Sequence, residues 1–257
     1  MAASGEQLEL LLPLGILAGA LSGLLGIGGG LIFSPLLLSL GLPPADALAT
    51  SSLAIVPTTL ASTYQHWRRG TLPWHLVGWI GGAALICGLL FASLAGLSEG
   101  WELLALQCGV YLLLAGIVRP RPQADPAATT PQPAPLGLVG VGSIAGLMGG
   151  MLGLGGGLLM VPLQVRLLRL PIHLAIRISS AAVLLSTVGA SSVLLPGGRG
   201  APLVALILGS SAAIGSGWTA ARVDQVRPQL LARLLRGLAV LLALDAGRRA
   251  VQAYLGG

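Results

Sequence analysis

Charged residues are scarce in this sequence. Asp, Glu, Lys and Arg make up 9% of the 257 residues, whereas a soluble domain carries about 25%. Hydrophobic residues account for 54%, and the mean hydropathy is +0.89. Such a chain cannot cover a water-facing surface with polar groups, which excludes a soluble globular protein. The composition predicts an all-α integral membrane protein with several spanning helices.

Lysine is absent, so all fourteen basic residues are arginines, and the net charge is +6. In a soluble protein this excess would suggest a nucleic-acid partner. Here the arginines fall in short segments between apolar runs, where they set membrane topology and contact anionic lipid headgroups. The predicted partner is therefore the lipid bilayer, and no nucleic-acid partner is expected.

Side chains that bind metals or carry out catalysis are few and scattered. The two cysteines, Cys87 and Cys108, lie within apolar runs and form neither a disulfide framework nor a metal-binding spacing. They are interpreted as small packing residues, with sulfur chemistry at a thiol as the alternative. The three histidines lie near predicted helix ends. No cofactor or metal is expected, and a membrane-embedded enzyme is disfavoured because its reactive side chains would have to cluster within the helices.

Long apolar runs dominate what is present. Six of the eight are near the ~20 residues that a membrane helix needs, whereas the first and fifth are 35 residues long and carry three consecutive glycines near the middle. The runs are Leu8–Leu42, Ala45–Tyr64, Pro73–Leu97, Glu102–Val118, Leu136–Leu170, Leu174–Leu195, Ala201–Ala221 and Leu230–Leu244.

The two halves of the chain repeat each other. At an offset of 127, Gly19, Gly23, Gly26, Gly28, Gly29, Gly30 and Pro35 match Gly146, Gly150, Gly153, Gly155, Gly156, Gly157 and Pro162. With one residue inserted, Ser51-Ser52 then match Ser179-Ser180. We infer a duplication, with a first membrane repeat at 1–118, a proline-rich cytoplasmic linker at 119–135 and a second membrane repeat at 136–257.

The arginines indicate how the halves are oriented. If each long run crosses the membrane once, seven arginines fall on each side and give no orientation signal. If each long run enters and returns on the same side, eleven fall on one side and three on the other. Positive loops face the cytoplasm. The second arrangement therefore predicts two inverted repeats, each a glycine-rich broken helix or hairpin followed by three transmembrane helices, with both termini outside the cytoplasm.

The glycine triplets predict helix breaks at the depth of the bilayer midplane. The helix that restarts after each triplet has unpaired amide groups and a partial positive charge at its first turn, and glycine lets a ligand approach that backbone closely. Two such ends can form an anion site without a formal charge in the membrane. Close helix packing is the alternative role, and we favour it for Gly19, Gly23, Gly146 and Gly150, whose four-residue spacing is typical of packed membrane helices.

The motif GxGGG followed five residues later by proline occurs in both halves, and AxxTS occurs at Ala47–Ser51. These motifs, together with His66 and Gly70 before the third helix, resemble the TauE/SafE family of sulfite and sulfonate exporters over nearly the whole chain. The resemblance implies transmembrane movement of small anions such as sulfite or organosulfonates. The second half departs from AxxTS, because Arg177 is added and Ile178 replaces the threonine.

Hydroxyl groups cluster at matching positions of both halves. Neutral donors suit a transported anion because they allow its release, whereas bonds to helix carbonyls are their alternative role. The predicted substrate-binding residues are Gly26, Gly28, Gly29, Gly30, Thr50 and Ser51 in the first half, Gly153, Gly155, Gly156, Gly157, Ser179 and Ser180 in the second, and also Arg177 and His66.

Three ionisable residues are considered individually: Arg177 and His66 each have two interpretations, and Asp245 has one. Arg177 either captures an anion from the cytoplasm or extends to the membrane surface from a helix end. His66 either gates or carries a proton, or is an interfacial histidine in an aromatic belt. Asp245 precedes Arg248 and Arg249 by three and four residues, which predicts an ion pair within one helix.

Together these patterns predict a transporter that exports small anions across the bacterial cytoplasmic (inner) membrane. An uptake carrier and a passive channel for small anions are the alternatives left open. The oligomeric state is also left open, with a homodimer as one option.

Overall fold

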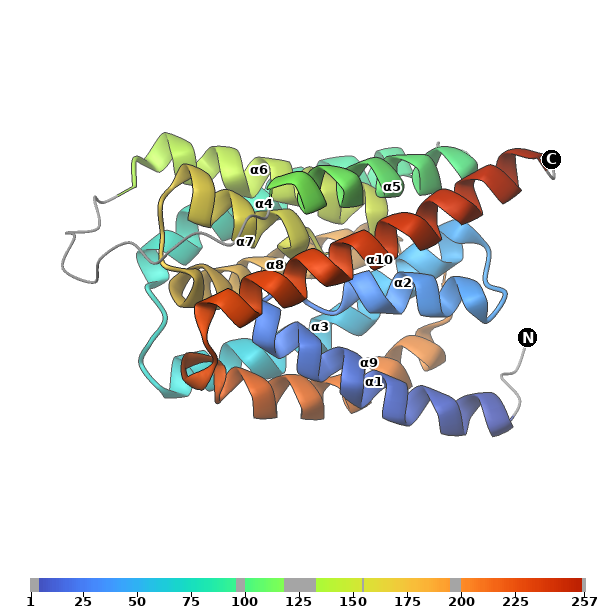
Figure 1. The fold of residues 1–257 in the computed structure, drawn as a ribbon, viewed down its shortest axis with the longest axis horizontal. Helices are drawn as coiled ribbons and strands as arrows, with labels where there is room; N and C mark the ends of the chain where they lie inside the picture. Colours follow the sequence, from blue (N-terminus) through green and yellow to red (C-terminus); the bar gives the residue numbers. More distant parts are fainter. Residues whose placement is uncertain (1–4, 96–99, 118–132, 154, 195–199, 256–257) are drawn as a thin grey trace.

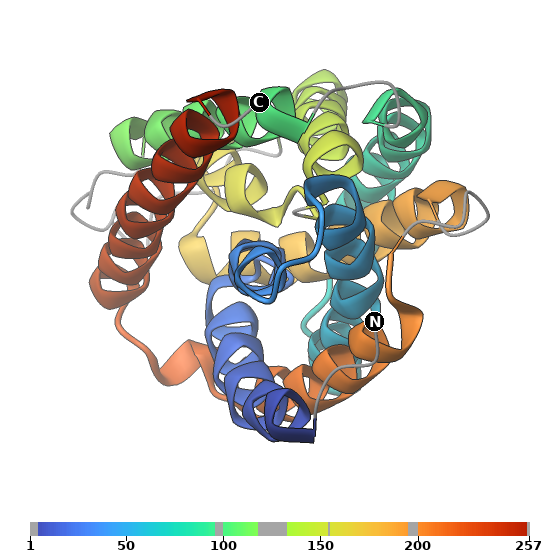
Figure 2. The ribbon, with the colours of Figure 1, turned by 90° about the vertical axis from the view of Figure 1, so that its right-hand side faces the viewer.

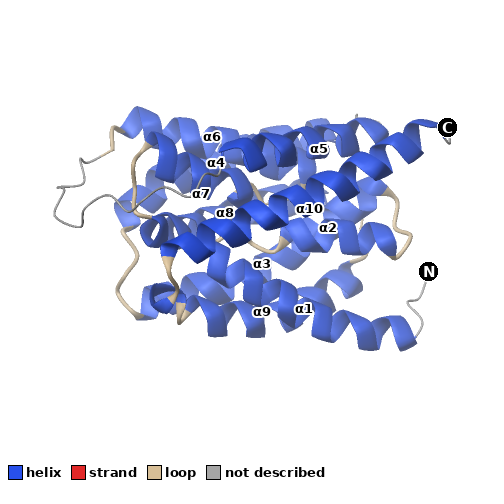
Figure 3. Cartoon of the chain, viewed as in Figure 1, coloured by secondary structure: helices blue, strands red, loops and turns tan. Residues whose placement is uncertain are grey.

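In the computed structural model, residues 5–95, 100–117, 133–153, 155–194 and 200–255 are described, and among them every regular element is a helix (Figure 3). This agrees with the all-α prediction. In an apolar chain the helix is favoured because it satisfies every interior backbone hydrogen bond within the segment. Most of the predicted linker, and with it Arg119 and Arg121, lies outside the described residues, as does Arg199.

The helices of the first half are α1 (Gly5–Leu25), α2 (Gly30–Ser39), α3 (Pro44–Arg68), α4 (Trp74–Ala95) and α5 (Gly100–Ile117). Those of the second half are α6 (Pro135–Leu152), α7 (Gly157–Leu167), α8 (Ile172–Leu194), α9 (Pro202–Ala220) and α10 (Pro228–Leu255), with a short 3-10 turn, η1 (Val223–Gln225), before α10.

Each long apolar run is divided into two helices at its glycines. The first run breaks between α1 and α2, where Gly26, Gly28 and Gly29 have φ of 67°, 81° and 86°. The second breaks between α6 and α7, where Gly153 and Gly155 have φ of 61° and 71° and Gly156 repeats this conformation. Positive φ disfavours residues with a β-carbon. The glycines are therefore what permits the chain to leave the helix at these two places.

Helix α1 packs against α9 through closely spaced glycines. A β-carbon added at Gly19 would overlap the carbonyl oxygen of Ala212, and one at Gly23 would overlap that of Ser216. Gly23 follows Gly19 by four residues in α1, and Ser216 follows Ala212 by four residues in α9, so the two helices are parallel. This confirms close packing as the role of these two glycines.

Helix α6 packs against α4 in the same manner. A β-carbon at Gly146 would overlap the carbonyl oxygen of Ala84, and one at Gly150 would lie 2.5 Å from that of Gly88. These helices are parallel as well. The first helix of each half therefore packs on a helix of the other half, which interlocks the two halves.

The remaining central contacts fix the direction of the other helices. The Ala201 amide, just before α9, donates to the Thr50 hydroxyl of α3, and the Ser216 hydroxyl of α9 donates to the Thr58 carbonyl of α3. The later residue of α3 thus pairs with the later residue of α9, so the two helices are parallel. The glycine contacts between α4 and α8 show that these two helices are also parallel. Because α3 and α4 run in opposite directions (Figure 1), helices α1, α3 and α9 run one way and α4, α6 and α8 the other.

Both long runs are hairpins. Since α1 and α3 share a direction, α2 must return to the end of the bundle at which α1 begins, and Figure 1 shows this return. Helix α7 likewise returns toward the end at which α6 begins (Figure 1). Viewed from one end, α2 lies near the middle of the bundle (Figure 2).

The hairpins place most arginines at one end of the bundle. The ends of α3, α7 and α9 and the beginnings of α8 and α10 lie at the left-hand end in Figure 1. Nine of the eleven described arginines belong to these segments, and only Arg248 and Arg249 belong to the other end of α10. Among the described residues, the arginine distribution expected for re-entrant hairpins is therefore present.

By length and composition, four of the described helices could cross a membrane: α4, α6, α8 and α9. Helix α3 has 25 residues but carries many hydroxyl groups, and its serine and threonine side chains are buried. A helix of this kind is suited to the interior of a membrane bundle, where protein surrounds it.

We predict that Gly19→Ala and Gly146→Ala each lower the Tm of the detergent-purified protein, because overpacking a tight contact costs about 1–3 kcal/mol. Gly82→Ala in α4 is the control, since its β-carbon would meet no atom within 4 Å and alanine favours a helix over glycine. Equal Tm values for all three variants would contradict the packing role.

Candidate functional site

The two glycine breaks meet at the centre of the fold, against the same two side chains. A β-carbon at Gly28 would lie 2.7 Å from Val183 Cγ1 and 2.9 Å from Ile55 Cγ2. One at Gly155 would lie 2.8 Å from Val183 Cγ1 and 3.3 Å from Ile55 Cδ1. Ile55 on α3 and Val183 on α8 are both fully buried. Both breaks therefore pack against these two residues.

The breaks also touch each other directly. A β-carbon at Gly157, the first residue of α7, would lie 2.8 Å from Ile27 Cα and 2.9 Å from the carbonyl oxygen of Gly26. Both breaks are buried. Residues 131 positions apart in the sequence, Gly26 and Gly157, thus form one buried region of non-helical backbone.

A serine from each half bonds the break of the other half. The Ser51 hydroxyl on α3 donates to the carbonyl oxygen of Gly153 over 3.1 Å, and the Ser179 hydroxyl on α8 donates to that of Gly26 over 2.8 Å. Both serines are fully buried. A buried carbonyl left without a partner costs about 1–3 kcal/mol, so these reciprocal bonds stabilise both breaks.

The amide groups that begin α2 and α7 directly follow the two breaks, and the first of them have no partner among the described residues. The first backbone bonds of α2 are those of Ile32 and Phe33 to the Gly29 carbonyl. In α7 the corresponding bond runs from Met160 to the Gly156 carbonyl. Among the described residues, the backbone amides of Gly30 and Leu31 in α2 and of Leu158 and Leu159 in α7 donate no hydrogen bond. Each helix start therefore offers free donors and a partial positive charge.

The other two predicted hydroxyls lie elsewhere. The Thr50 hydroxyl donates to the Asp46 carbonyl and accepts from the Ala201 amide at the beginning of α9. The Ser180 hydroxyl donates to Ile176, within its own helix. Of the four predicted serines and threonines, Ser51 and Ser179 reach the breaks directly.

His66 and Arg177 act on each other electrostatically on the arginine-rich side of the breaks, and Arg177 follows Ile176, whose carbonyl oxygen would lie 2.7 Å from a β-carbon at Gly26. His66 is 1% exposed, so the interpretation as an interfacial aromatic-belt residue is wrong. Arg177 pairs with Asp224 of η1 over 2.5 Å, and its side chain is 20% exposed. The guanidinium is thus held by a carboxylate rather than extended freely to the membrane surface.

Several residues near the site were not predicted from the sequence. Ile55 and Val183 carry no sequence signal, because apolar residues are common throughout the chain. Ser186 donates to the Gly155 carbonyl over 3.1 Å, and its place in a hydroxyl cluster was the available signal. Gln164 on α7 is fully buried, and neither of its amide atoms has a partner among the described residues. A glutamine within an apolar run was the signal for that residue.

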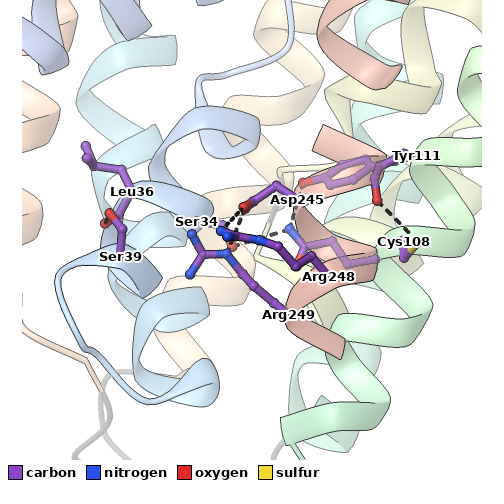
Figure 4. Close-up of polar contacts among 10 residues, drawn as sticks. Ser34, Leu36, Ser39, Cys108, Tyr111, Asp245, Arg248 and Arg249 are labelled. Atoms are coloured by element: carbon purple, nitrogen blue, oxygen red, sulfur yellow. Dashed lines mark hydrogen bonds and ion pairs between the residues drawn. The ribbon is translucent and has the colours of Figure 1, made fainter. Parts of the chain in front are cut away.

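A separate polar cluster lies between α2, α5 and α10 (Figure 4). Gln107 donates to Ser34 over 3.3 Å and to the Tyr111 hydroxyl over 2.6 Å. Asp245 pairs with the arginines three and four residues later, at 3.3 and 2.7 Å. The predicted intrahelical ion pair is confirmed. The polar groups of this cluster therefore find their partners within it, which indicates a structural role.

The chemistry available at the centre is neutral hydrogen-bond donation. The free amides that begin α2 and α7 can donate to an anion, while the Ser51 and Ser179 hydroxyls are engaged with the break carbonyls and hold the two breaks in place. The described residues contain no group of three or more His, Cys, Asp or Glu side chains arranged for a metal ion. The arrangement is suited to reversible binding of an anion.

Comparisons with known proteins show what the chain is similar to. A family model described as "Sulfite exporter TauE/SafE" matches residues 11–246. The chain is 26% identical over 259 residues to "Probable membrane transporter protein YunE" of Bacillus subtilis (strain 168), covering 91% of this chain and 94% of that protein.

Two further relatives match over shorter regions. "Sulfite exporter TauE/SafE family protein 1" of Arabidopsis thaliana is 36% identical over 117 residues, covering 44% of this chain and 25% of that protein. A "Probable membrane transporter protein" of Xylella fastidiosa (strain Temecula1) is 33% identical over 181 residues, covering 66% of this chain and 67% of that protein. No solved structure matches the chain.

We predict that Ser179→Ala lowers the free energy of unfolding by about 1–3 kcal/mol, because it leaves the buried Gly26 carbonyl unpaired. Ser180→Ala is the matched control, since its hydroxyl bonds only its own helix. Thermal unfolding in detergent measures both. A loss of Tm for Ser180→Ala as large as that for Ser179→Ala would contradict the reciprocal bonding.

Proposed function

The chain belongs to the sulfite exporter TauE/SafE family of multi-pass membrane transporters, and on that premise we propose that it exports a small anion across the bacterial cytoplasmic membrane. The anion is sulfite or an organosulfonate, as the family description and the glycine–proline motifs suggest. Membership of a transporter family also agrees with the expectation that the chain is not an enzyme.

The observation that carries this proposal is the meeting of the two breaks. Gly28 and Gly155 contact the same Ile55 and Val183, and each break begins a helix whose first amides are free. A sulfur oxyanion presents several acceptor oxygens, and the free amides of the two helix starts would bind them together. We place the substrate here, with Ser51 and Ser179 positioning the two breaks through their carbonyls.

The donors explain how binding stays reversible. An arginine fork would bind an oxyanion by two charge-assisted hydrogen bonds, which favours retention over release. The centre instead offers backbone amides and the partial positive charge of two helix starts. Binding energy is then spread over neutral groups, and the anion can leave toward either side when one hairpin moves.

We further propose that the fold consists of two inverted repeats. Helices α1 and α6 run in opposite directions, and so do α3 and α8 and also α4 and α9. The reciprocal bonds of Ser51 and Ser179 support the same relation, since each serine occupies the equivalent position in its half. With positive loops inside, the arginine-rich end faces the cytoplasm.

The proposal predicts saturable flux of sulfite in proteoliposomes containing the purified protein, and loss of that flux in Gly29→Ala. The added methyl group would crowd the free amides and would lie 2.8 Å from the Phe33 ring. Gly41→Ala is the matched control: Gly41 has φ of 83°, close to the 86° of Gly29, but its β-carbon would meet no atom within 4 Å. Both variants carry similar backbone strain, so only Gly29→Ala is expected to lose sulfite affinity.

Normal sulfite affinity in the monodisperse Gly29→Ala protein would contradict the central site. Gly156 is not a useful position for this test, because a β-carbon there would overlap the carbonyl oxygen of Ala145. Flux that rises linearly with sulfite concentration would favour a passive channel. Flux that runs only into right-side-out vesicles would favour an uptake carrier.

The topology is tested by labelling single cysteines in a cysteine-free background with a membrane-impermeant maleimide. We expect Gly70→Cys and Pro171→Cys to be labelled from the cytoplasmic face and Gly41→Cys from the other. All three positions lie in connections between helices. Single crossings by the long runs would instead place Pro171→Cys on the same face as Gly41→Cys and would overturn the inverted repeats.

A further inference from the structure

A row of polar side chains continues from the first break to the arginine-rich end of α3. Thr59 lies at its start, since its Cγ2 would be 3.2 Å from a β-carbon at Gly28. Thr63 and His66 follow at four and seven residues, which places all three on one face of the helix. All three are at least nine-tenths buried. The row therefore connects the central site with the end of the bundle.

Two members of this row have no hydrogen-bond partner. Among the described residues, neither Thr63 Oγ1 nor His66 Nε2 has a partner, although both atoms are buried. A buried polar atom without a partner is costly, and it is expected where a ligand supplies the missing bond. The hydroxyl of Thr59, one turn nearer the centre, donates to the Ile55 carbonyl of its own helix and so has a partner.

Arg177 completes the group from the opposite helix, α8. Arg177, Asp224 and Arg69 are the charged residues that lie close enough to act on the His66 ring. One terminal nitrogen of Arg177 donates to Asp224 Oδ1, whereas its buried Nε has no partner among the described residues. A guanidinium binds a planar pair of oxygens through Nε and a terminal nitrogen together. Asp224 thus uses one half of this fork.

The position of Asp224 allows it to move away from Arg177. It lies on the short η1 turn, and its side chain is 44% exposed. Water can therefore reach this carboxylate and take the place of the Arg177 contact. The turn has a second attachment to α8, because a ring nitrogen of His173 lies 3.0 Å from the Val226 carbonyl. Loss of the Asp224 contact therefore need not release the segment.

We propose that Thr63, His66 and Arg177 form a second oxyanion site at the cytoplasmic end of the transport path, and that Asp224 occupies Arg177 until an oxyanion displaces it. The proposal rests on the anion transport proposed above. An incoming sulfite or sulfonate accepts from the Arg177 fork, from the Thr63 hydroxyl and from His66 in its Nε2–H form. The anion then moves along the face of α3 toward the glycine breaks.

The test measures uptake of labelled sulfite into inside-out membrane vesicles, whose cytoplasmic face is accessible, from cells that express the full chain. Asp224→Asn removes the competing charge, so we expect the half-saturating sulfite concentration to fall about two- to fivefold, with little change in maximal flux. Arg177→Lys keeps the charge but loses the fork, and we expect the half-saturating concentration to rise about tenfold. Thr63→Val, which keeps the shape of the side chain, raises it as well.

Asp245→Asn is the matched control. This substitution also removes a carboxylate that is paired with arginine, but one far along α10 from the arginine-rich end. We expect no change in the half-saturating sulfite concentration. A half-saturating concentration that is unchanged or raised in Asp224→Asn, or unchanged in Thr63→Val, would overturn the second site while wild-type transport continues. Absence of sulfite transport by the wild-type protein would instead overturn the proposed function itself.

Discussion

Non-helical backbone buried in an apolar interior must find hydrogen-bond partners within the protein, and this constraint shapes the centre of the fold. Each glycine break exposes carbonyls that lipid cannot satisfy. Ser51 and Ser179 supply donors across the two halves, to Gly153 and Gly26. Neither half can complete its own break, so the halves must interlock. The parallel glycine contacts of α1 with α9 and of α6 with α4 bring them close enough to do so.

The same constraint generates the proposed chemistry. Where the carbonyls of the breaks are satisfied and the first amides of the following helices are free, the region has an excess of donors. An anion is the ligand that such a region favours. Arg177, next to the Ile176 that contacts the first break, is paired with Asp224. In our proposal this pair lies on the cytoplasmic side, where a charged group attracts the anion before neutral amides bind it at the breaks.

Much of this could be predicted from the sequence because it depends on local patterns. Three consecutive glycines in an apolar run indicate a break, and the arginine count separated hairpins from single crossings. Asp245 and its arginines lie within one helical turn, so their pairing follows from spacing. The contacts that define the centre depend on tertiary packing instead. Ile55 and Val183 are ordinary apolar residues, and Arg177 and Asp224 are 47 positions apart with no pattern to relate them.

The central claim is that the backbone amides at both breaks bind one anion together. Hydrogen–deuterium exchange of the detergent-purified protein, with and without saturating sulfite, tests it most directly. The account predicts slower exchange in the peptides that contain Gly28–Leu31 and in those that contain Gly155–Leu158, because amides bonded to an anion are protected. Unchanged exchange in either segment at sulfite saturation would contradict a shared site.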